Sequence, residues 1–413
     1  MAKRAVFGPV AALLVLIIAL WARWGAISNR ESRGALFDST KGPVRISPEI
    51  STRVDVPTDR ALSRAYRYLW PARSNPLGKV LHALRCLPDS SLKPDLERPT
   101  ITEMQSVLLD VEAARKWYGG EFSLLETRSG VRYATSARVS AQAHVNQALS
   151  VLAELGIPLP TRLHTPEGAF TVADILADAV ANFDLSDEIE WTAVSLALYL
   201  PPQRSWRNKF NEQFNFDDLT YTLMSRRLDN RSCAATHLMY SLALLFRVDR
   251  QQPILSQAAR ERLTSFLTRV RDQVVSHQCK NGAIEYLWFN NMLKDAWYTN
   301  LVASLSSSQS ADAIRAVQEK VDATNSWSDV TRPDFGSQDS LVLSTGHNIE
   351  WLILLPAEMQ PQHEFFERSV LFLNVALEEA TESEMRIGFC PYCHATRAVK
   401  MLSVSAASSR NGR

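Results

Sequence analysis

One pattern recurs six times along this chain of 413 residues: a helix-start signal followed by a nearly continuous apolar helical segment. The six starts are His144, Ile189, Thr236, Asp295, Gly346 and Cys393. Successive starts lie 45 to 59 residues apart, and a more amphipathic segment separates each apolar segment from the next. A repeat of about 50 residues with two helices per unit is typical of stacked helical hairpins. The recurrence therefore predicts a chain built from six hairpins.

The amphipathic segments supply the second helix of each hairpin. In Thr171–Phe183 the apolar residues recur at helical spacing and form one stripe on an otherwise polar helix. Segments such as Ile189–Leu200 are apolar on nearly every side, as expected of helices that contact both an outer layer and each other. The other amphipathic segments are Ile101–Tyr118, Asp217–Leu228, Ala258–Val275, Ala311–Val321 and His363–Ala380. The pattern predicts an all-α protein, an α/α toroid of about six helical hairpins.

Composition and charge exclude several classes of partner. Lys and Arg number 45 and Asp and Glu number 44, which leaves a net charge of +1 without a basic block, so we expect no nucleic-acid partner. Neither a GxGxxG nor a GxxxxGK[ST] loop occurs, so we expect no nucleotide. The five cysteines are too few and too odd in number for a disulfide framework.

The N-terminus carries a candidate membrane anchor. Lys3 and Arg4 precede an uncharged apolar run at residues 5–22, which is long enough for a short membrane-spanning helix. Trp21 and Trp24 occupy the region where a signal peptide has its small-residue cleavage site, so we favour an uncleaved anchor. Three arginines follow the run and oppose the positive-inside rule, whereas short N-terminal tails usually stay cytoplasmic. We expect a single-pass membrane protein whose globular part is extracytoplasmic.

These patterns divide the chain into four segments. We expect the membrane anchor at residues 1–24, a polar linker with short helices such as Asp59–Trp70 at residues 25–99, and the toroid at residues 100–404. A low-complexity, disordered tail is expected at residues 405–413. The linker is rich in proline, and we expect loops around Pro76, Pro88, Pro94 and Pro99.

The N-terminal ends of the inner helices are the expected place for a site. In a closed helical ring they surround one end of a central funnel, where free backbone N–H groups and the positive ends of the helix dipoles lie. A concave, water-accessible pocket is where ligands usually bind. His237 and Glu190 lie in these first turns and are our candidates for substrate binding. The helix dipole alone also favours an acid such as Glu190 in a first turn.

The segment Thr345–Trp351 is the most specific candidate site. Thr345 is expected to be the N-cap of an inner helix, and His347 and Glu350, three residues apart, share a helix face. An imidazole beside a carboxylate can act as a proton-transfer base, and the adjacent Trp351 offers a flat ring for binding a sugar. In the alternative interpretation, Glu350 only orients His347 as a structural hydrogen-bond pair.

Residues 346–355, GHNIEWLILL, resemble the GHxxEWxxLL signature of the N-acylglucosamine 2-epimerase and cellobiose 2-epimerase families. These families are α/α toroids, and they invert a sugar C2 centre with two histidines that act as acid and base. His347 matches the histidine of the signature, and His394 with Arg397 resembles the H-x-x-R segment that carries the second histidine. The resemblance therefore implies His347, Glu350 and His394 as catalytic residues. One hairpin separates the two histidines here, whereas more chain separates them in the families.

Cys390, Cys393 and His394 form a C-x-x-C-H pattern, which is that of c-type haem attachment. A CxxC disulfide and free thiols are the alternatives, since a five-residue pattern also arises by chance. A zinc site needs further ligands at close range, and the chain has neither an HExxH motif nor a second CxxC pair. We therefore predict no metal site and no cofactor.

Three functions remain open. The first is a membrane-anchored enzyme that acts on carbohydrate, of epimerase type or, if Glu190 and Glu350 face each other, of glycosidase or lyase type. The second is a non-catalytic toroid scaffold that binds a glycan or a protein, and the third is a mono-haem c-type cytochrome. An enzyme requires His347, Glu350 and a second proton-transfer group to converge on one cavity. A scaffold predicts that these side chains are buried and paired with one another.

Overall fold

The computed structural model describes residues 37–49, 54, 56–87, 98–120, 125–127, 130–135, 142–166, 168–228, 233, 235–306 and 337–408. This part of the chain is mostly helical and contains three two-stranded antiparallel ribbons. The prediction of an all-α protein is therefore confirmed. The apolar run at residues 5–22, the expected helix Ala311–Val321 and the end of the expected tail at 409–413 lie outside the described residues.

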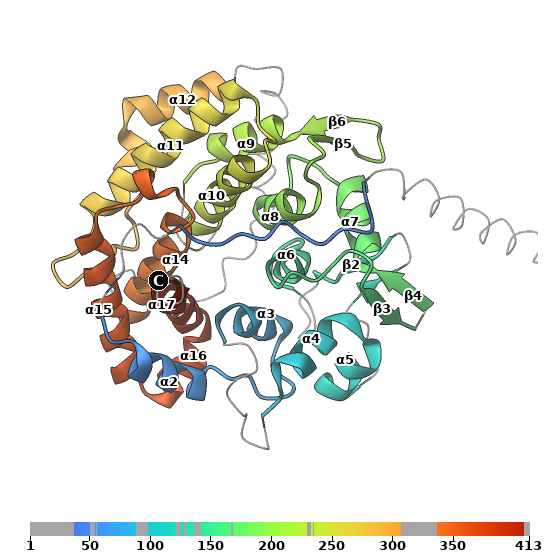
Figure 1. Ribbon diagram of the computed structural model, residues 1–413, viewed down its shortest axis with the longest axis horizontal. Coiled ribbons are helices and arrows are strands. Elements are labelled where there is room, and N and C mark those ends of the chain that lie inside the picture. Colours follow the sequence, from blue (N-terminus) through green and yellow to red (C-terminus); the bar gives the residue numbers. More distant parts are fainter. Residues whose placement is uncertain are drawn as a thin grey trace, which may run out of the picture.

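Six helices form a closed circle of neighbours (Figure 1). They are α3 (Leu77–Cys86), α6 (Gln147–Glu154), α8 (Glu190–Tyr199), α10 (Thr236–Gln251), α14 (Gln338–Leu352) and α17 (Phe389–Ser408). Each helix packs against the next in this order, and α17 packs against α3. Every residue of α8 is buried, because this helix contacts α6 and α10 within the circle and an outer helix as well.

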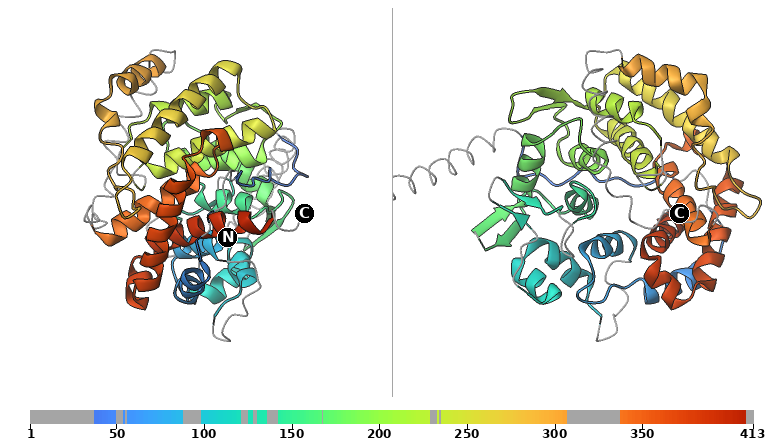
Figure 2. Two further views of the ribbon diagram at one scale, coloured as in Figure 1. Left: turned by 60° about the vertical axis from the view of Figure 1, so that its left-hand side comes forward. Right: turned by 180° about the vertical axis from the view of Figure 1, so that it is seen from behind.

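The remaining helices lie around this circle, as the views in Figures 1 and 2 show. They are α2 (Asp59–Tyr68), α4 (Ile101–Leu109), α5 (Val111–Tyr118), α7 (Val172–Ala181), α9 (Phe216–Ser225), α11 (Gln257–Ser276), α12 (Ala296–Ser306), α15 (His363–Glu379) and α16 (Glu382–Ile387). In α11 the buried residues, among them Leu263, Phe266 and Val270, recur at helical spacing. This outer helix therefore buries one stripe, as its amphipathic pattern predicts.

Short elements occupy the connections between helices. The ribbons pair β1 (Leu125–Glu126) with β2 (Arg132–Tyr133), β3 (Arg162–Thr165) with β4 (Gly168–Thr171), and β5 (Ser205–Arg207) with β6 (Gln213–Asn215). Two 3₁₀ turns are η1 (Met292–Lys294) and η3 (Ala357–Met359). The ribbons β3–β4 and β5–β6 each lead from an inner helix to the outer helix that follows it, so they extend the hairpins without entering the circle.

The predicted position of one of the six inner helices is wrong. Helix α12, which follows Asp295, packs against the outer helix α9. The sixth member of the circle is instead α3, which lies between α17 and α6 in the region that the sequence indicated as a loop-rich linker. Pro76 directly precedes α3, and proline is compatible with a helix start as well as with a loop. The apolar side chains of α3 are buried, among them Leu77, Val80 and Leu81.

Helix α14 begins earlier than expected. Its N-cap is Ser337, so Gly346 and His347 lie within the helix and not in its first turn. Thr345 is therefore not an N-cap. Its hydroxyl donates a hydrogen bond of 2.6 Å to the carbonyl of Leu341, one turn back along the same helix.

The glycine within α14 is explained by the helix that packs against it. A Cβ on Gly346 would lie 2.7 Å from the backbone nitrogen of Ala395 and 2.8 Å from the carbonyl carbon of His394. A residue without a side chain lets the backbones of α14 and α17 approach this closely. The crossing places His347 and Glu350 of α14 beside His394 of α17.

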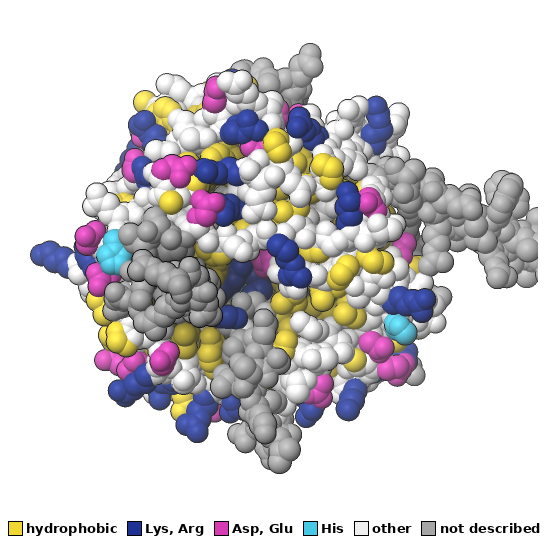
Figure 3. Space-filling model, viewed as in Figure 1, with side chains coloured by type: hydrophobic (Ala, Val, Ile, Leu, Met, Phe, Trp, Pro, Cys, Tyr) yellow, Lys and Arg dark blue, Asp and Glu magenta, His cyan; other side chains and the backbone are white. Residues whose placement is uncertain are grey.

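The described surface carries both signs of charge. On the face drawn in Figure 3, acidic and basic side chains are interspersed, and the surface is hollowed near its centre. This distribution agrees with the balanced net charge of +1. Among the described residues, no helix combines the length and the apolar character that a membrane span requires.

Candidate functional site

Five of the eight histidines form a continuous row between the inner helices. The ring centroids lie 5.2 Å apart for His82 and His394, and 3.4 Å apart for His394 and His347. The row continues from His347 to His237 at 5.2 Å, and from His237 to His144 at 4.8 Å. Four of these rings come from α3, α17, α14 and α10, and His144 lies just before α6. Closure of the helical circle is what brings them together.

His394 is held by the carboxylate of Glu350. Its Nδ1 lies 2.8 Å from Glu350 Oε1, and the other carboxylate oxygen accepts a bond of 2.7 Å from Arg397, one turn along α17. With Nδ1–H donating to the carboxylate, the neutral ring carries its free lone pair on Nε2. This Nε2 atom is buried and has no hydrogen-bond partner. The arrangement is that of an oriented base, because the carboxylate stabilises the imidazolium that forms when Nε2 takes up a proton.

Glu350 belongs to a buried network of two carboxylates and two guanidiniums. Glu154 of α6 accepts hydrogen bonds from Arg85 of α3 at 2.6 Å and from Arg397 at 3.2 Å. The hydroxyl of Tyr240 donates to Glu154 and accepts from Arg397 at 2.9 Å. The four charged groups come from four inner helices and balance one another. This part of the interior is therefore electrically neutral by itself.

The arginines fix the charge state of both carboxyls. Burial acts to raise the pKa of Glu350, but Arg397 and His394 outweigh this effect and hold the pKa well below its usual range. In the same way, burial acts to raise the pKa of Glu154, but Arg85 and Arg397 outweigh burial and lower it. Both side chains are thus carboxylates at neutral pH, and each is matched by a cation. Because the matched charges are buried, their removal one at a time is costly.

His347 lies against His394 with its ring nearly parallel, at an interplanar angle of 28°. Its Nε2 is buried without a hydrogen-bond partner. Burial lowers the pKa of His347, and burial together with the neighbouring His347 lowers the pKa of His394 well below its usual value. Glu350 bonds to His394 and not to His347, so the structural pair expected between His347 and Glu350 does not form as a hydrogen bond.

The three expected substrate-binding residues lie in different surroundings. His237 is part of the histidine row, packs edge-on against Trp191 at 5.0 Å, and has a buried Nδ1 without a partner. Glu190 is buried, and its carboxylate accepts a bond of 3.1 Å from Arg226. Trp351 is fully buried, and its indole N–H donates to Asn348 in the same helix. Only His237 therefore joins the candidate centre with His347, Glu350 and His394.

Sequence reasoning missed Arg85, Glu154 and Tyr240. Arg85 and Glu154 are single charged residues in otherwise apolar inner segments, LHALRC and LSVLAEL. A lone charge in such a segment rarely stays buried unless it is paired, so this signal could have identified both. Arg85 also lies over the faces of Trp191 and Tyr240, at 4.8 and 5.2 Å from the ring centroids. Cation–π contact adds to its stabilisation.

The cysteines of the C-x-x-C-H pattern lie within α17 and have different neighbours. All five cysteines are free, and Cys393 is buried. Cys393 lies beside Cys86 of α3, whereas Cys390 lies beside Cys233. Atoms of Cys233, Cys390 and His347 that can bind a metal all lie within 4.8 Å of one another. Because the two thiols lie beside different partners, the arrangement does not favour attachment of one haem to both.

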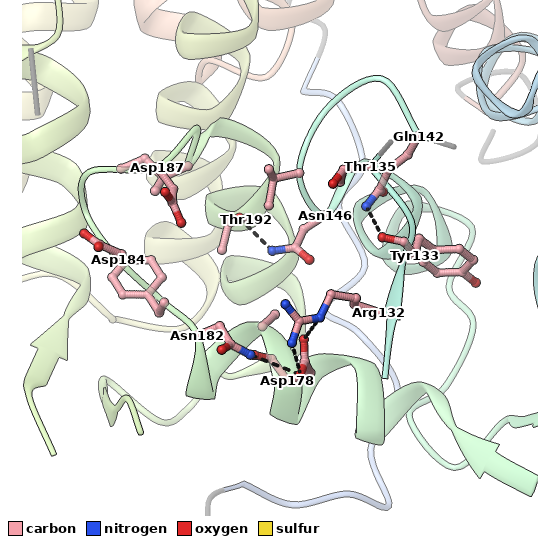
Figure 4. A pocket seen from close by; sticks show the side chains of 14 residues that line it. Arg132, Tyr133, Thr135, Gln142, Asn146, Asp178, Asn182, Asp184, Asp187 and Thr192 are labelled. Atoms are coloured by element: carbon pink, nitrogen blue, oxygen red, sulfur yellow. Dashed lines mark hydrogen bonds and ion pairs between the residues drawn. The ribbon is translucent and has the colours of Figure 1, made fainter. Parts of the chain in front are cut away.

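A polar pocket of about 200 Å³ opens between α6, α7 and α8 (Figure 4). Its polar lining includes Arg132, Asn146, Asp178, Asn182, Asp184, Asp187 and Thr192. Asn146 just before α6 donates to Thr192 in the first turn of α8 at 2.9 Å, so the pocket lies at the N-terminal ends of two inner helices. His144 and Glu188 pair with each other, and each is next in sequence to a lining residue. The histidine row therefore ends close to this pocket.

The chain matches no protein-family model, no curated protein and no solved structure. The likeness to the 2-epimerases consequently rests on residues 346–355 and on His394 with Arg397 alone. What the centre can do follows from its own geometry, in which two histidines, a carboxylate and two thiols share one buried space.

Proposed function

We propose that this protein is a membrane-anchored α/α-toroid enzyme that moves a proton on and off carbon in a carbohydrate, as a 2-epimerase or related isomerase does. The single observation that carries the proposal is the pair His347 and His394. The two rings are in contact, a carboxylate orients one of them, and each has a buried Nε2 without a partner. The closed circle of inner helices supports the toroid, and the anchor at residues 5–22 stays a prediction from the sequence.

The pair has the chemistry that C2 inversion needs. In the open-chain form of an aldose, the C1 carbonyl makes the C2–H bond acidic. The free Nε2 of His394 takes this proton, the electron pair forms an enediolate with C1, and Glu350 stabilises the imidazolium. His347 then returns a proton to C2 from the opposite face, and the proton on His394 passes to solvent. Because burial lowers the pKa of His347 in the closed centre, this ring must take up its proton from water when the sugar separates the pair. Because the rings are now 3.4 Å apart, the sugar must separate them to bind between them.

A non-catalytic scaffold is the rival function. Its expectation is met by Glu350, Glu154, Arg85 and Arg397, which saturate one another. The histidines do not meet the expectation that buried side chains are paired. A buried polar atom left without a partner costs about 1–3 kcal/mol, and this centre holds unpartnered nitrogens on three rings. Such a cost is expected where a side chain is kept available for a ligand.

Solvent exchange at carbon tests the proposal without knowledge of the preferred sugar. The full chain, solubilised in detergent, is incubated in D₂O with N-acetylglucosamine, cellobiose, glucose and mannose, and the C2 proton signal is followed by NMR. We expect loss of this signal and appearance of the C2 epimer for at least one sugar. General acid–base catalysis contributes about 10²–10⁴-fold, so His394→Asn and His347→Asn should each slow exchange by that factor.

The matched control is His363→Asn, which changes a partly exposed histidine of the outer helix α15. It should leave exchange unchanged. Melting curves recorded side by side separate catalysis from stability, since Nε2 of His347 has no partner to lose and the ring interacts otherwise with the thiol of Cys233. If His347→Asn lowers the melting temperature markedly, or if wild type exchanges no C2 proton with any sugar of the panel, the scaffold function replaces the enzyme.

A further inference from the structure

Two thiols and an imidazole from three separate elements meet beside the histidine pair. Cys233 lies in the turn before α10, Cys390 lies at the start of α17, and His347 lies within α14. One sulfur or nitrogen atom from each lies within 4.8 Å of the other two. Cys390 also belongs to a second such group, with His82 and His394. Metal-binding atoms are therefore concentrated around Cys390.

Two ring nitrogens beside this cluster have no hydrogen-bond partner, although the thiol of Cys233 lies within hydrogen-bonding reach of Cys390 and His347. His347 and His394 are each 2% exposed, and the Nε2 atom of each has no hydrogen-bond partner. Cys233 and Cys390 form no disulfide. Buried polar atoms normally find partners. A group of unpaired nitrogens next to two free thiols is therefore an independent sign that something binds here.

The backbone is bent to bring Cys233 to this place. Cys233 has φ of +49° and Ala235 has φ of +62°, both in the left-handed region that residues with a side chain rarely adopt. The carbonyl of Cys233 accepts hydrogen bonds from the backbone and the hydroxyl of Thr236, which hold the turn against the start of α10. Strain of this kind persists where the surrounding structure enforces it, and it is concentrated at functional sites.

We propose that Cys233, Cys390 and His347 bind a thiophilic divalent cation, of which Zn²⁺ is the representative. Two thiolates and one imidazole form a ligand set of zinc sites with three protein ligands, which leave the fourth position to water or substrate. Thiolates disfavour Mg²⁺ and Ca²⁺, which prefer oxygen ligands. Binding replaces the two thiol protons, which pass to solvent.

Charge balance favours this cation at this place. The neighbouring carboxylates Glu154 and Glu350 are already matched by Arg85 and Arg397. A divalent cation with two thiolates and a neutral imidazole is also neutral, so the buried centre stays uncharged when it is occupied. The sequence did not predict the site, because its ligands are far apart along the chain and match no short zinc motif.

The inference goes beyond the proposed sugar chemistry, shares His347 with it, and is tested separately from it. A bound cation would make His347 a ligand, and a ligating imidazole cannot also return a proton to C2, so proton exchange is measured on the metal-free chain. Cation binding is measured without any sugar. A chain that binds the cation but in its metal-free form exchanges no C2 proton overturns only the proposed function, and a chain that exchanges the proton but takes up no cation overturns only this site.

The test uses the full chain, expressed without a histidine tag and purified under reducing conditions. We expect elemental analysis to find one Zn²⁺ per chain. After removal of the metal, Co²⁺ should restore one cation per chain and give the thiolate-to-cobalt charge-transfer band and the visible bands of tetrahedral Co²⁺. Cys233→Ser and Cys390→Ser should each bind less Co²⁺ and weaken the charge-transfer band, because one of the two thiolates is lost. Cys279→Ser is the matched control, a free cysteine outside the cluster, and should keep the band.

A measurement on wild type alone guards against variants that fail to fold. X-ray absorption of the Zn²⁺-loaded chain should show two sulfur neighbours at about 2.3 Å. The site is overturned if wild type binds no more cation than Cys233→Ser, or if bound Co²⁺ shows no thiolate band. It is also overturned if the metal-free chain as purified holds a Cys233–Cys390 disulfide that reduction does not convert into a cation-binding site.

Discussion

Gly346→Ala should destabilise the protein, although alanine is the better helix former. Within a helix, alanine is favoured over glycine by about 1 kcal/mol. Here the added Cβ would lie 2.7 Å from the nitrogen of Ala395 and 2.8 Å from the carbonyl carbon of His394. Both atoms belong to the backbone of α17, which cannot rotate away as a side chain can. The helices must separate, and an extra methyl group forced into a packed interior costs about 1–3 kcal/mol.

We take the upper part of that range, so the net loss after the helix-propensity gain is about 1–2 kcal/mol. With about 2–4 °C per kcal/mol, the melting temperature should fall by roughly 2–8 °C. Gly78→Ala is the matched control, because Gly78 lies in the inner helix α3 and a Cβ there meets nothing within 4 Å. Its melting temperature should stay unchanged or rise. If thermal unfolding followed by circular dichroism gives both variants the same shift, the close crossing of α14 and α17 is refuted.

Two further predictions concern stability. Glu154→Gln should cost about 3–5 kcal/mol at pH 7, because Arg85 and Arg397 lose a buried counter-charge. The folded-state pKa of Glu154 is lowered from 4.5, so its stabilisation is present above pH 4.5 and is lost as pH falls through the lowered pKa. Denaturant unfolding at several pH values should show the gap between variant and wild type closing in acid, and a constant gap would contradict this. Thr100→Ala removes the N-cap hydrogen bond to Glu103 in α4 and should cost about 1 kcal/mol; an unchanged unfolding midpoint would show that this cap contributes nothing.

The sequence predicted the layer of most helices but not of all. Thr236 starts α10 as expected, and α8 follows Ile189 directly, because a segment that is apolar all round has few places except an interior. Asp295 accepts a hydrogen bond from the N–H of Trp297 at the start of α12. Its capping signal was therefore real, but a cap marks where a helix begins and not the layer in which it lies. Only packing against other segments assigns the layer.

The sequence predicted several residues of the centre, but not which of them are hydrogen-bonded to one another. His347, Glu350 and His394 could be singled out from the local sequence, and the structure does bring them together. Which ring the carboxylate bonds depends on how α14 and α17 cross, and the crossing depends on the close approach at Gly346. The contribution of Cys233 depends on a turn with left-handed backbone. Neither feature leaves a periodic signal in the sequence.

The interior of the helical circle therefore has two parts with different chemistry. Glu154, Glu350, Arg85 and Arg397 balance and bind one another, and a group that is already satisfied has little left to offer a ligand. The neighbouring histidines keep buried ring nitrogens without partners, and the thiols beside them form no disulfide. Substitutions in the ionic part should thus act first on stability, and substitutions of His347 or Cys233 should act first on proton exchange or cation content. A Cys233→Ser variant that lost stability as heavily as Glu154→Gln, with cation content unchanged, would show that this division is wrong.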